Sequence, residues 1–255
     1  MATDPLAAFR LDGRTAIVTG ASSGLGAGFG IALALVGARV VLAARRLDRL
    51  AEVAEQIRAV GGQALTVKAD VADPADCADV VAAAMAEFGS VDVLVNNAGL
   101  GPAVPASRET PESFRAVIDV NLNGTFWMSQ ECARVMKPGS SIVNVSSVLG
   151  LVASHFPQAS YSASKAGVLG LTRDLAQQWS RRKGIRVNAL CPGYLITEMN
   201  SEHADQIGAV VADGTLLGRF GEQAEVDSAL IFLASPASSF VTGTHLTVDG
   251  GYTAI

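Results

Sequence analysis

Short apolar runs alternate with longer segments of helical periodicity along most of the chain. Seven runs rich in Val, Ile, Leu and Ala are predicted strands, at 15–19, 39–43, 64–69, 91–96, 141–146, 185–190 and 245–249. Most of these runs are apolar at nearly every position, which is typical of strands in a parallel sheet that is covered on both faces. The pattern therefore favours a buried parallel sheet.

The segments between these runs carry helix signals. Apolar residues recur at helical spacing over 47–60, and Gly61 follows. In the next such segment Asp73 can cap the helix, Pro74 suits its first turn, and Gly89 can end it. Alternating strands and helices predict an α/β fold, a Rossmann-type doubly wound, mostly parallel seven-stranded sheet with helices on both faces. Because no linker or repeat interrupts the pattern, residues 1–255 are expected to form a single domain.

Composition narrows the function classes. The chain has 255 residues, 49% of them apolar, and a net charge of −5, which does not fit the basic footprint of a nucleic-acid binder. Three Cys and three His are scattered, so no metal site is expected. The N-terminus does not have the pattern of a signal peptide, and the longest apolar run, 31–44, is too short for a membrane span. We therefore expect a cytoplasmic protein with no nucleic-acid or membrane partner.

A glycine-rich stretch, "TGASSGLG" at 19–26, follows the first predicted strand and opens the next helix. Gly20, Gly24 and Gly26 allow a tight turn and let the backbone approach a pyrophosphate at a helix N-terminus. An ordinary glycine-rich loop is the alternative, but the position directly after the first strand of an α/β chain favours a dinucleotide.

The stretch "YSASKAGVLG" at 161–170 places Tyr161 and Lys165 one helical turn apart. An ammonium group near a phenol lowers the pKa of the phenol, so the pair can serve as a general acid and base. By itself the pair is weak evidence, because Tyr and Lys at this spacing also occur on solvated helix faces.

With the glycine loop, this pair resembles the short-chain dehydrogenase/reductase family, from about Arg14 to Gly251. The matching motifs are the glycine spacing Thr-Gly-x-x-x-Gly-x-Gly, "NNAG" at 96–99, "SS" at 146–147, "YSASK" at 161–165, "CPG" at 191–193 and "DGG" at 249–251. The resemblance implies an oxidoreductase that interconverts a ketone or aldehyde and an alcohol by hydride transfer with a nicotinamide cofactor. It also implies a homotetramer or a dimer.

The resemblance assigns a role to each catalytic position. Tyr161 is the general acid/base, Lys165 lowers its pKa and binds the nicotinamide ribose, Ser147 polarises the substrate oxygen, and Asn121 joins a water-mediated proton relay to Lys165. Ser147 lies one residue farther from Tyr161 than the family usually has, so Ser146 stays open as the alternative.

The cofactor preference follows from the end of the second predicted strand. Ala44 stands where NAD-selective members have an acid, and Arg45 follows it, with Ser23 as a second contact for a 2′-phosphate. NADP(H) is therefore the preferred cofactor and NAD(H) the alternative. The cofactor-binding residues implied by the resemblance are Gly20, Ser22, Ser23, Gly24, Leu25, Gly26, Arg45, Asp70, Val71, Asn97, Ala98, Gly99, Tyr161, Lys165, Pro192, Gly193, Ile196 and Thr197.

Substrate specificity is expected in an insertion at about 194–218 and in the segment after Ser147. The residues expected to touch substrate are Ser147, Leu149, His155, Phe156, Tyr161, Tyr194 and Met199. The substrate itself stays open: an acyl-carrier-protein thioester, a sugar-derived polyol, a steroid and a small cyclic ketone all fit. A solvent-exposed loop is the alternative for His155 and Phe156.

Several other functions compete with the leading one, an NADP(H)-dependent ketone or aldehyde reductase. An NAD(H)-dependent secondary-alcohol or polyol dehydrogenase and a 3-oxoacyl-[acyl-carrier-protein] reductase stay open. A dehalogenase of this fold would lack the glycines, a non-catalytic scaffold would lack the Tyr or the Lys, and an enoyl reductase would space Tyr and Lys more widely. Ile231, Phe232 and Leu233 in the last predicted helix offer more apolar surface than one core needs, which supports the tetramer.

Overall fold

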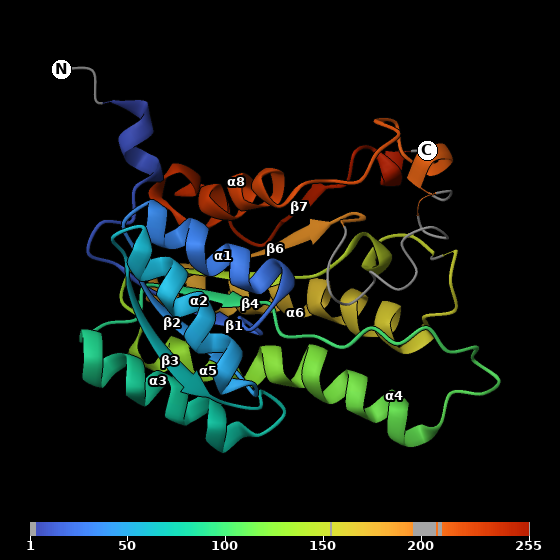
Figure 1. Ribbon diagram of the computed structural model, residues 1–255, viewed down its shortest axis with the longest axis horizontal. Coiled ribbons are helices and arrows are strands. Elements are labelled where there is room, and N and C mark those ends of the chain that lie inside the picture. The colour runs from blue at the N-terminus through green and yellow to red at the C-terminus, as the bar shows by residue number, and fades with distance from the viewer. Residues whose placement is uncertain (1–3, 154, 196–207, 209–210, 255) are drawn as a thin grey trace.

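The computed structural model describes residues 4–153, 155–195, 208 and 211–254. Seven parallel strands form one sheet in the order β3-β2-β1-β4-β5-β6-β7 (Figure 1). Their bounds are β1 Thr15–Thr19, β2 Arg39–Ala44, β3 Gln63–Lys68, β4 Val93–Asn96, β5 Ser141–Val145, β6 Arg186–Pro192 and β7 His245–Val248. The doubly wound fold predicted from the sequence is confirmed, and each predicted strand is found within about two residues of its expected bounds.

Helices cover both faces of this sheet (Figure 1). One face carries α1 (Gly24–Leu35), α2 (Leu47–Ala59) and α8 (Gln223–Ala234), and the other carries α3 (Pro74–Phe88), α5 (Gly124–Val135) and α6 (Ala159–Lys183), with α4 (Pro111–Ile118) leading toward α5. Short 3₁₀ segments lie at Pro5–Phe9, Val148–Gly150, Pro236–Ser238 and Tyr252–Ala254, and a π-helical turn at Asp119–Asn123.

Neighbouring positions of a strand face opposite cores. In β1, Ala16 and Val18 pack with α1, α2 and α8, whereas Ile17 packs with α3, α5 and α6. All three side chains are fully buried. Since both faces are covered, every position of the strand must be apolar or hydrogen-bonded, which explains the continuous apolar runs in the sequence.

The predicted helix signals act as expected in α3. The Asp73 carboxylate accepts a hydrogen bond from the Ala75 amide at 2.9 Å, Pro74 opens the helix, and Gly89 ends it at φ 74°, in the left-handed region. The same chemistry ends α6, where Gly184 has φ 67°. Local sequence therefore fixes where these helices begin and end.

Two glycines within α1 have a packing role that the sequence did not reveal. A Cβ atom at Gly28 would lie 2.3 Å from the side-chain carbon Cδ of Gln223 in α8. One at Gly30 would lie 2.7 Å from Leu42 in β2. Both distances are far below van der Waals contact, so these glycines let α1 sit close to the sheet and to α8.

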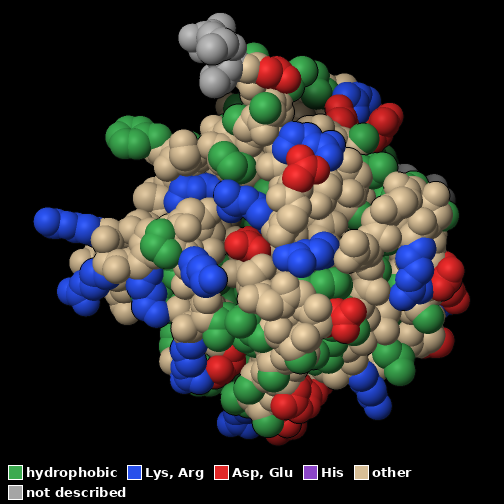
Figure 2. All heavy atoms as spheres, turned by 90° about the vertical axis from the view of Figure 1, so that its left-hand side faces the viewer, with side chains coloured by type: hydrophobic (Ala, Val, Ile, Leu, Met, Phe, Trp, Pro, Cys, Tyr) green, Lys and Arg blue, Asp and Glu red, His purple; other side chains and the backbone are tan. Residues whose placement is uncertain are grey.

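The surface away from the strand carboxyl ends carries mixed charge. Figure 2 shows the left-hand face of Figure 1, where Lys and Arg are interspersed with Asp, Glu and apolar side chains. Over the described residues, no helix is long and apolar enough to cross a membrane. No group of three or more His, Cys, Asp or Glu in that part of the chain is arranged to hold a metal ion.

Candidate active site

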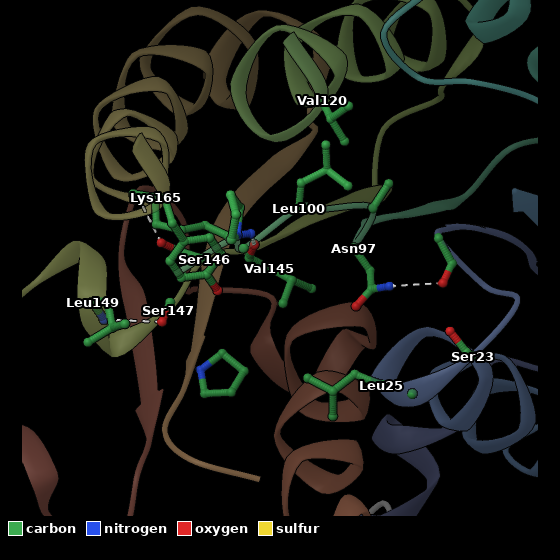
Figure 3. Close-up of a pocket in the computed structure, with 18 of the residues that line it drawn as sticks. Ser23, Leu25, Asn97, Leu100, Val120, Val145, Ser146, Ser147, Leu149 and Lys165 are labelled. Carbon is green, nitrogen blue, oxygen red and sulfur yellow. Dashed lines mark hydrogen bonds between the residues drawn. The ribbon is translucent and has the colours of Figure 1, made fainter. Parts of the chain in front are cut away.

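A cavity of about 830 Å³ opens where β1 and β4, which are neighbours in the sheet, end. After β1 the chain continues to β2, toward one edge of the sheet, and after β4 it continues to β5, toward the other edge. Doubly wound folds bind ligands at such a switch point. Figure 3 shows Ser147 and Lys165 at one end of the cavity, Ser23 and Leu25 at the other, and Asn97 between them. The cavity is therefore an elongated site with two chemically different ends.

The glycine loop forms the first end. Gly20 has φ 64°, and a Cβ atom there would lie 2.7 Å from the backbone of Ala98. The Asn97 amide donates hydrogen bonds to the carbonyl oxygens of Thr19 at 3.0 Å and Gly20 at 3.3 Å. These contacts hold the loop against the end of β4. Glycine is required because any side chain would push the two segments apart.

Gly26 was expected to contact the cofactor, but it lies outside the cavity. A Cβ atom at Gly26 would lie 2.3 Å from the Gly20 carbonyl oxygen and 2.5 Å from the Asn97 amide nitrogen. It therefore shapes the loop from beneath. Ser23 stands at the N-cap of α1 without making a side-chain capping bond, so the first amides of α1 are suited to an anion such as a phosphate.

Two arginines border this end at the close of β2. Ala44 ends the strand and has no polar side chain. Arg46 donates to the Ser22 hydroxyl at 3.2 Å and to the Ser23 hydroxyl at 2.7 Å. Arg45 lies 3.9 Å from the Asp70 carboxylate. Ser23, which the sequence paired with Arg45, is thus contacted by Arg46.

Asp70 and Val71 also line this end of the cavity. The Asp70 carboxylate accepts a hydrogen bond from the Ala72 amide at 3.1 Å, as a loop aspartate does. Its side chain is nevertheless about 42% exposed, so it can also meet a ligand.

Ser147, Tyr161 and Lys165 form the other end. Ser147 follows β5, and its hydroxyl accepts a hydrogen bond from the Leu149 amide at 3.1 Å. Tyr161 and Lys165 come from the first turns of α6, and the ammonium of Lys165 lies 5.6 Å from the centre of the Tyr161 ring. The Lys165 ammonium also donates to the Val145 carbonyl oxygen at 2.8 Å. A hydroxyl, a phenol and an ammonium thus meet at one end of the cavity.

Burial changes the pKa values of Tyr161 and Lys165. Burial raises the pKa of Tyr161, because it disfavours the charged phenolate, and a hydrogen bond from Ser147 opposes the shift. Burial lowers the pKa of Lys165 to about 8, and that side chain is only 4% exposed. The two pKa values move apart, because burial favours the uncharged phenol and the uncharged amine alike.

The two serines after β5 face different surroundings. The Ser146 hydroxyl donates to the carbonyl oxygen of Lys165 at 2.9 Å, so it bonds the backbone of α6. The Ser147 hydroxyl instead lies by the Tyr161 phenol, where it opposes the rise in the pKa of that group. Adjacent residues of an extended segment point to opposite sides, which explains the difference. The geometry therefore favours Ser147 over Ser146 as the residue beside the phenol.

Asn121 lies behind the wall of the cavity, in the π-helical turn between α4 and α5. Its amide accepts from the Leu100 amide at 2.8 Å, and donates to the Leu100 carbonyl at 2.9 Å and to the Ser164 hydroxyl at 2.9 Å. Ser164 in turn donates to the Tyr161 carbonyl oxygen at 2.7 Å. Asn121 thus joins the segment after β4 to the helix of Tyr161. A proton relay through Asn121 stays a prediction.

Most of the other expected site residues also line the cavity. This holds for Gly20, Ser22, Gly24, Leu25, Ala98, Gly99, Leu149, Phe156, Pro192, Gly193 and Tyr194. His155 does not: its ring packs against Tyr252 and lines a second, smaller cavity. The chain bends here, so His155 and the adjacent Phe156 line different cavities. Ile196, Thr197 and Met199 lie outside the described residues.

Several lining residues were missed by the sequence reading. They include Leu100, Gly101, Pro102, Ala103, Val120, Val148, Pro157 and Gln158. The segment 100–103 directly follows the motif at 96–99 at the end of β4. Since residues that follow the carboxyl ends of strands line such sites, the sequence could have predicted that this segment lines the cavity. Val120 and Gln158 offered none, because helix packing brings them there.

Comparison with known proteins agrees with this geometry. The model of a protein family described as enoyl-(acyl carrier protein) reductase matches residues 20–253. Galactitol 2-dehydrogenase (L-tagatose-forming) of Cereibacter sphaeroides is 42% identical over 251 residues, 96% of this chain and 97% of that protein. Cis-4-hydroxycyclohexanecarboxylate dehydrogenase of Sinomonas cyclohexanicum is 43% identical over 247 residues, 95% of this chain and 97% of that protein.

Two solved structures share the whole fold. A short-chain type dehydrogenase/reductase from Mycobacterium marinum has a TM-score of 0.95 and 34% identity, covering 99% of this chain and 100% of that chain. A gluconate 5-dehydrogenase from Burkholderia cenocepacia, solved with NADP and tartrate, has a TM-score of 0.92 and 36% identity, with the same coverage.

Proposed function

The chain belongs to the short-chain dehydrogenase/reductase family and is an oxidoreductase, and from this premise we propose that it interconverts a ketone and a secondary alcohol with NADP(H) as the preferred cofactor. The observation that carries the proposal is the convergence of Ser147, Tyr161 and Lys165 at one end of a cavity whose other end is the glycine loop. Such a cavity can hold an elongated dinucleotide and a small substrate together.

The described residues fit a nicotinamide dinucleotide. The loop at 20–24 and the uncapped amides of α1 suit its pyrophosphate, Asp70 and Val71 would contact its adenine, and Lys165 would bind a ribose hydroxyl. When bound, the dinucleotide supplies or accepts the hydride.

The proton is handled by the protein. In reduction, the Tyr161 hydroxyl donates its proton to the substrate oxygen while a hydride reaches the carbonyl carbon; in oxidation, the phenolate takes the hydroxyl proton. Ser147 hydrogen-bonds the same oxygen and orients it. The protonated Lys165 favours the phenolate, because an adjacent positive charge stabilises a negative one. The spacing of Tyr161 and Lys165 favours carbonyl over enoyl reduction.

The preference for NADP(H) rests on Ala44, Arg45 and Arg46. Ala44 offers no carboxylate to bind the two ribose hydroxyls or to repel a 2′-phosphate. The Arg46 guanidinium lies over the Ser22 and Ser23 hydroxyls, and Arg45 reaches the same end of the cavity. A guanidinium binds phosphate through paired, charge-assisted hydrogen bonds. The NADP in the related gluconate 5-dehydrogenase supports the proposal.

The substrate end is lined mostly by apolar residues, including Leu100, Pro102, Val148, Leu149 and Phe156. These side chains support a substrate whose carbonyl lies on an apolar or weakly polar frame, such as a cyclic ketone. A polyol is the second candidate, because a relative named galactitol 2-dehydrogenase is 42% identical over nearly the whole chain.

The test measures kcat/KM for NADPH and NADH with cyclohexanone, and for NADP⁺ and NAD⁺ with cyclohexanol and galactitol. The variants are Arg45→Ala, Arg46→Ala and the double variant, with Arg49→Ala as control, because Arg49 lies in α2 paired to Glu52 and outside the cavity. Each site variant should weaken NADPH use by roughly ten- to a hundredfold, the effect of about 1.5–3 kcal/mol for a hydrogen bond to a charged group. NADH use should hardly change.

Equal efficiency of the wild type with NADPH and NADH would contradict the cofactor preference. Absence of turnover with every alcohol and ketone of the panel would contradict the substrate class.

A further inference from the structure

Residues 249–254, here the C-terminal turn, are held by hydrogen bonds beside the substrate end of the cavity. The Asp249 carboxylate accepts hydrogen bonds from the Gly251 amide at 2.9 Å and from the Thr253 amide and hydroxyl at 2.8 and 2.7 Å. The Gly250 carbonyl accepts from the Leu217 amide at 3.0 Å. Four hydrogen bonds thus fix a short segment, so the side chain it carries has a defined position.

That side chain is Tyr252, which is only 6% exposed. Its ring packs edge-on against Tyr194, with ring centres 5.2 Å apart and the planes at 86°. It also belongs to one apolar cluster with Val148 and Leu149, against which Tyr161 packs. Tyr194, Val148 and Leu149 line the main cavity. Tyr252 therefore stands directly behind the wall that the substrate would touch.

Tyr252 also lines a second cavity of about 320 Å³. Its walls are Val152, Ala153, His155, Gly214 and Tyr252 itself. The His155 ring lies 6.2 Å from the Tyr252 ring, at 73°. Tyr252 thus contacts two aromatic side chains, Tyr194 in the wall of the main cavity and His155 in the wall of the second.

We propose that Tyr252 is the partition that sets the size limit of the substrate, and that a smaller side chain joins the two cavities into one larger substrate site. The inference rests on the proposed ketone–alcohol activity. In the wild type, the ring would exclude substrates that carry a bulky group remote from the reacting carbon, and compact cyclic or short-chain ketones would be preferred. The effect belongs to the ring, because the Tyr252 side chain contacts the described residues around it through its ring.

The experiment compares wild type, Tyr252→Ala and Tyr252→Leu, with Tyr252→Phe as the matched variant that keeps the ring. Each is tested with cyclohexanone and 4-tert-butylcyclohexanone, which share the reacting carbonyl and differ in the remote group. The measured quantity is the ratio of kcat/KM for the bulky ketone to that for the small one. Thermal melting and NADPH binding show whether each variant is folded, and the Leu variant serves if Ala unfolds.

The ratio should rise roughly tenfold or more in Tyr252→Ala and stay near the wild-type value in Tyr252→Phe. One methylene more or less in an apolar pocket changes the discrimination between two substrates by about 10–200-fold. A folded Ala or Leu variant with an unchanged ratio would overturn the proposal, as would an equal rise in the Phe variant.

A crystal structure of the nucleotide-free Ala or Leu variant separates this proposal from the proposed function. One continuous cavity from Ser147 to Gly214 supports the partition even if neither ketone is a substrate. If the segment 148–157 closes over the space and two cavities remain, the partition is refuted. If the wild type turns over neither ketone, this result counts against the proposed function and leaves the partition untouched.

Discussion

Replacing Lys165 with Met should change how the stability of the nucleotide-free protein depends on pH. In the folded state, burial lowers the pKa of Lys165 from 10.5 to about 8. In the unfolded state the side chain has its ordinary value, about 10.4. Between these two values the unfolded chain binds more protons than the folded one, so the free energy of unfolding rises with pH in this window.

The magnitude follows from the size of the shift. One unit of pKa corresponds to about 1.4 kcal/mol, so the buried ammonium costs about 3 kcal/mol below about pH 8 relative to its neutral form at high pH. Because the side chain is 4% exposed, screening by solvent removes little of this cost. From about pH 7.5 to 9.5 the wild type should gain about 2 kcal/mol relative to Lys165→Met.

Urea unfolding followed by tryptophan fluorescence gives both free energies over this pH range. Loss of the hydrogen bond to Val145 adds an offset that does not depend on pH, so the slope of the difference is the diagnostic quantity. Lys165→Leu should give the same slope with a different offset, because packing differs while the lost titration is the same. A difference between wild type and variants that is constant with pH would refute the depressed pKa of Lys165.

Three further outcomes are expected. Tyr161→Phe should lower turnover by about two to four orders of magnitude with little loss of NADPH binding measured by fluorescence, since it removes the proton donor; more than a tenth of wild-type turnover, with chemistry limiting, would contradict the assignment. Ser147→Ala should lower kcat strongly, whereas Ser146→Ala should mainly lower the melting temperature, because its hydroxyl donates to the backbone of α6; the opposite pattern would identify Ser146 as the residue that acts on substrate. Light scattering should show a tetramer at micromolar concentration, with Ile231 and Phe232, both half-buried in the single chain, at an interface; a monomer would exclude it.

The candidate site was predictable to the extent that it depends on local sequence. The glycine loop, the pair Tyr161 and Lys165, and the arginines after β2 are short motifs whose spacing carries their chemistry. What the motifs could not reveal was the direction of each side chain. Ser146 and Ser147 differ by one position along an extended segment, and only the placement of α6 shows that Ser146 bonds the helix backbone.

The sequence also left the contacts between distant segments undetermined. It placed Asn121 on an apolar helix face but did not show the π-helical turn or the bonds to Leu100. It placed His155 with the substrate, whereas the fold turns its ring toward Tyr252. It gave no account of Gly28, which lies against the side chain of Gln223, nearly two hundred residues away.

By itself, therefore, the sequence determined the order of strands and helices, the ends of helices such as α3, and the identity of the reactive groups. Each of these depends on apolar periodicity, capping and side-chain chemistry within a few neighbouring residues. Only the tertiary structure decided which serine lies by the phenol, which arginine reaches the glycine loop, and that Tyr252 packs against both Tyr194 and His155. These outcomes depend on packing between segments far apart in the chain, where a rotation of one residue changes which surface a side chain meets.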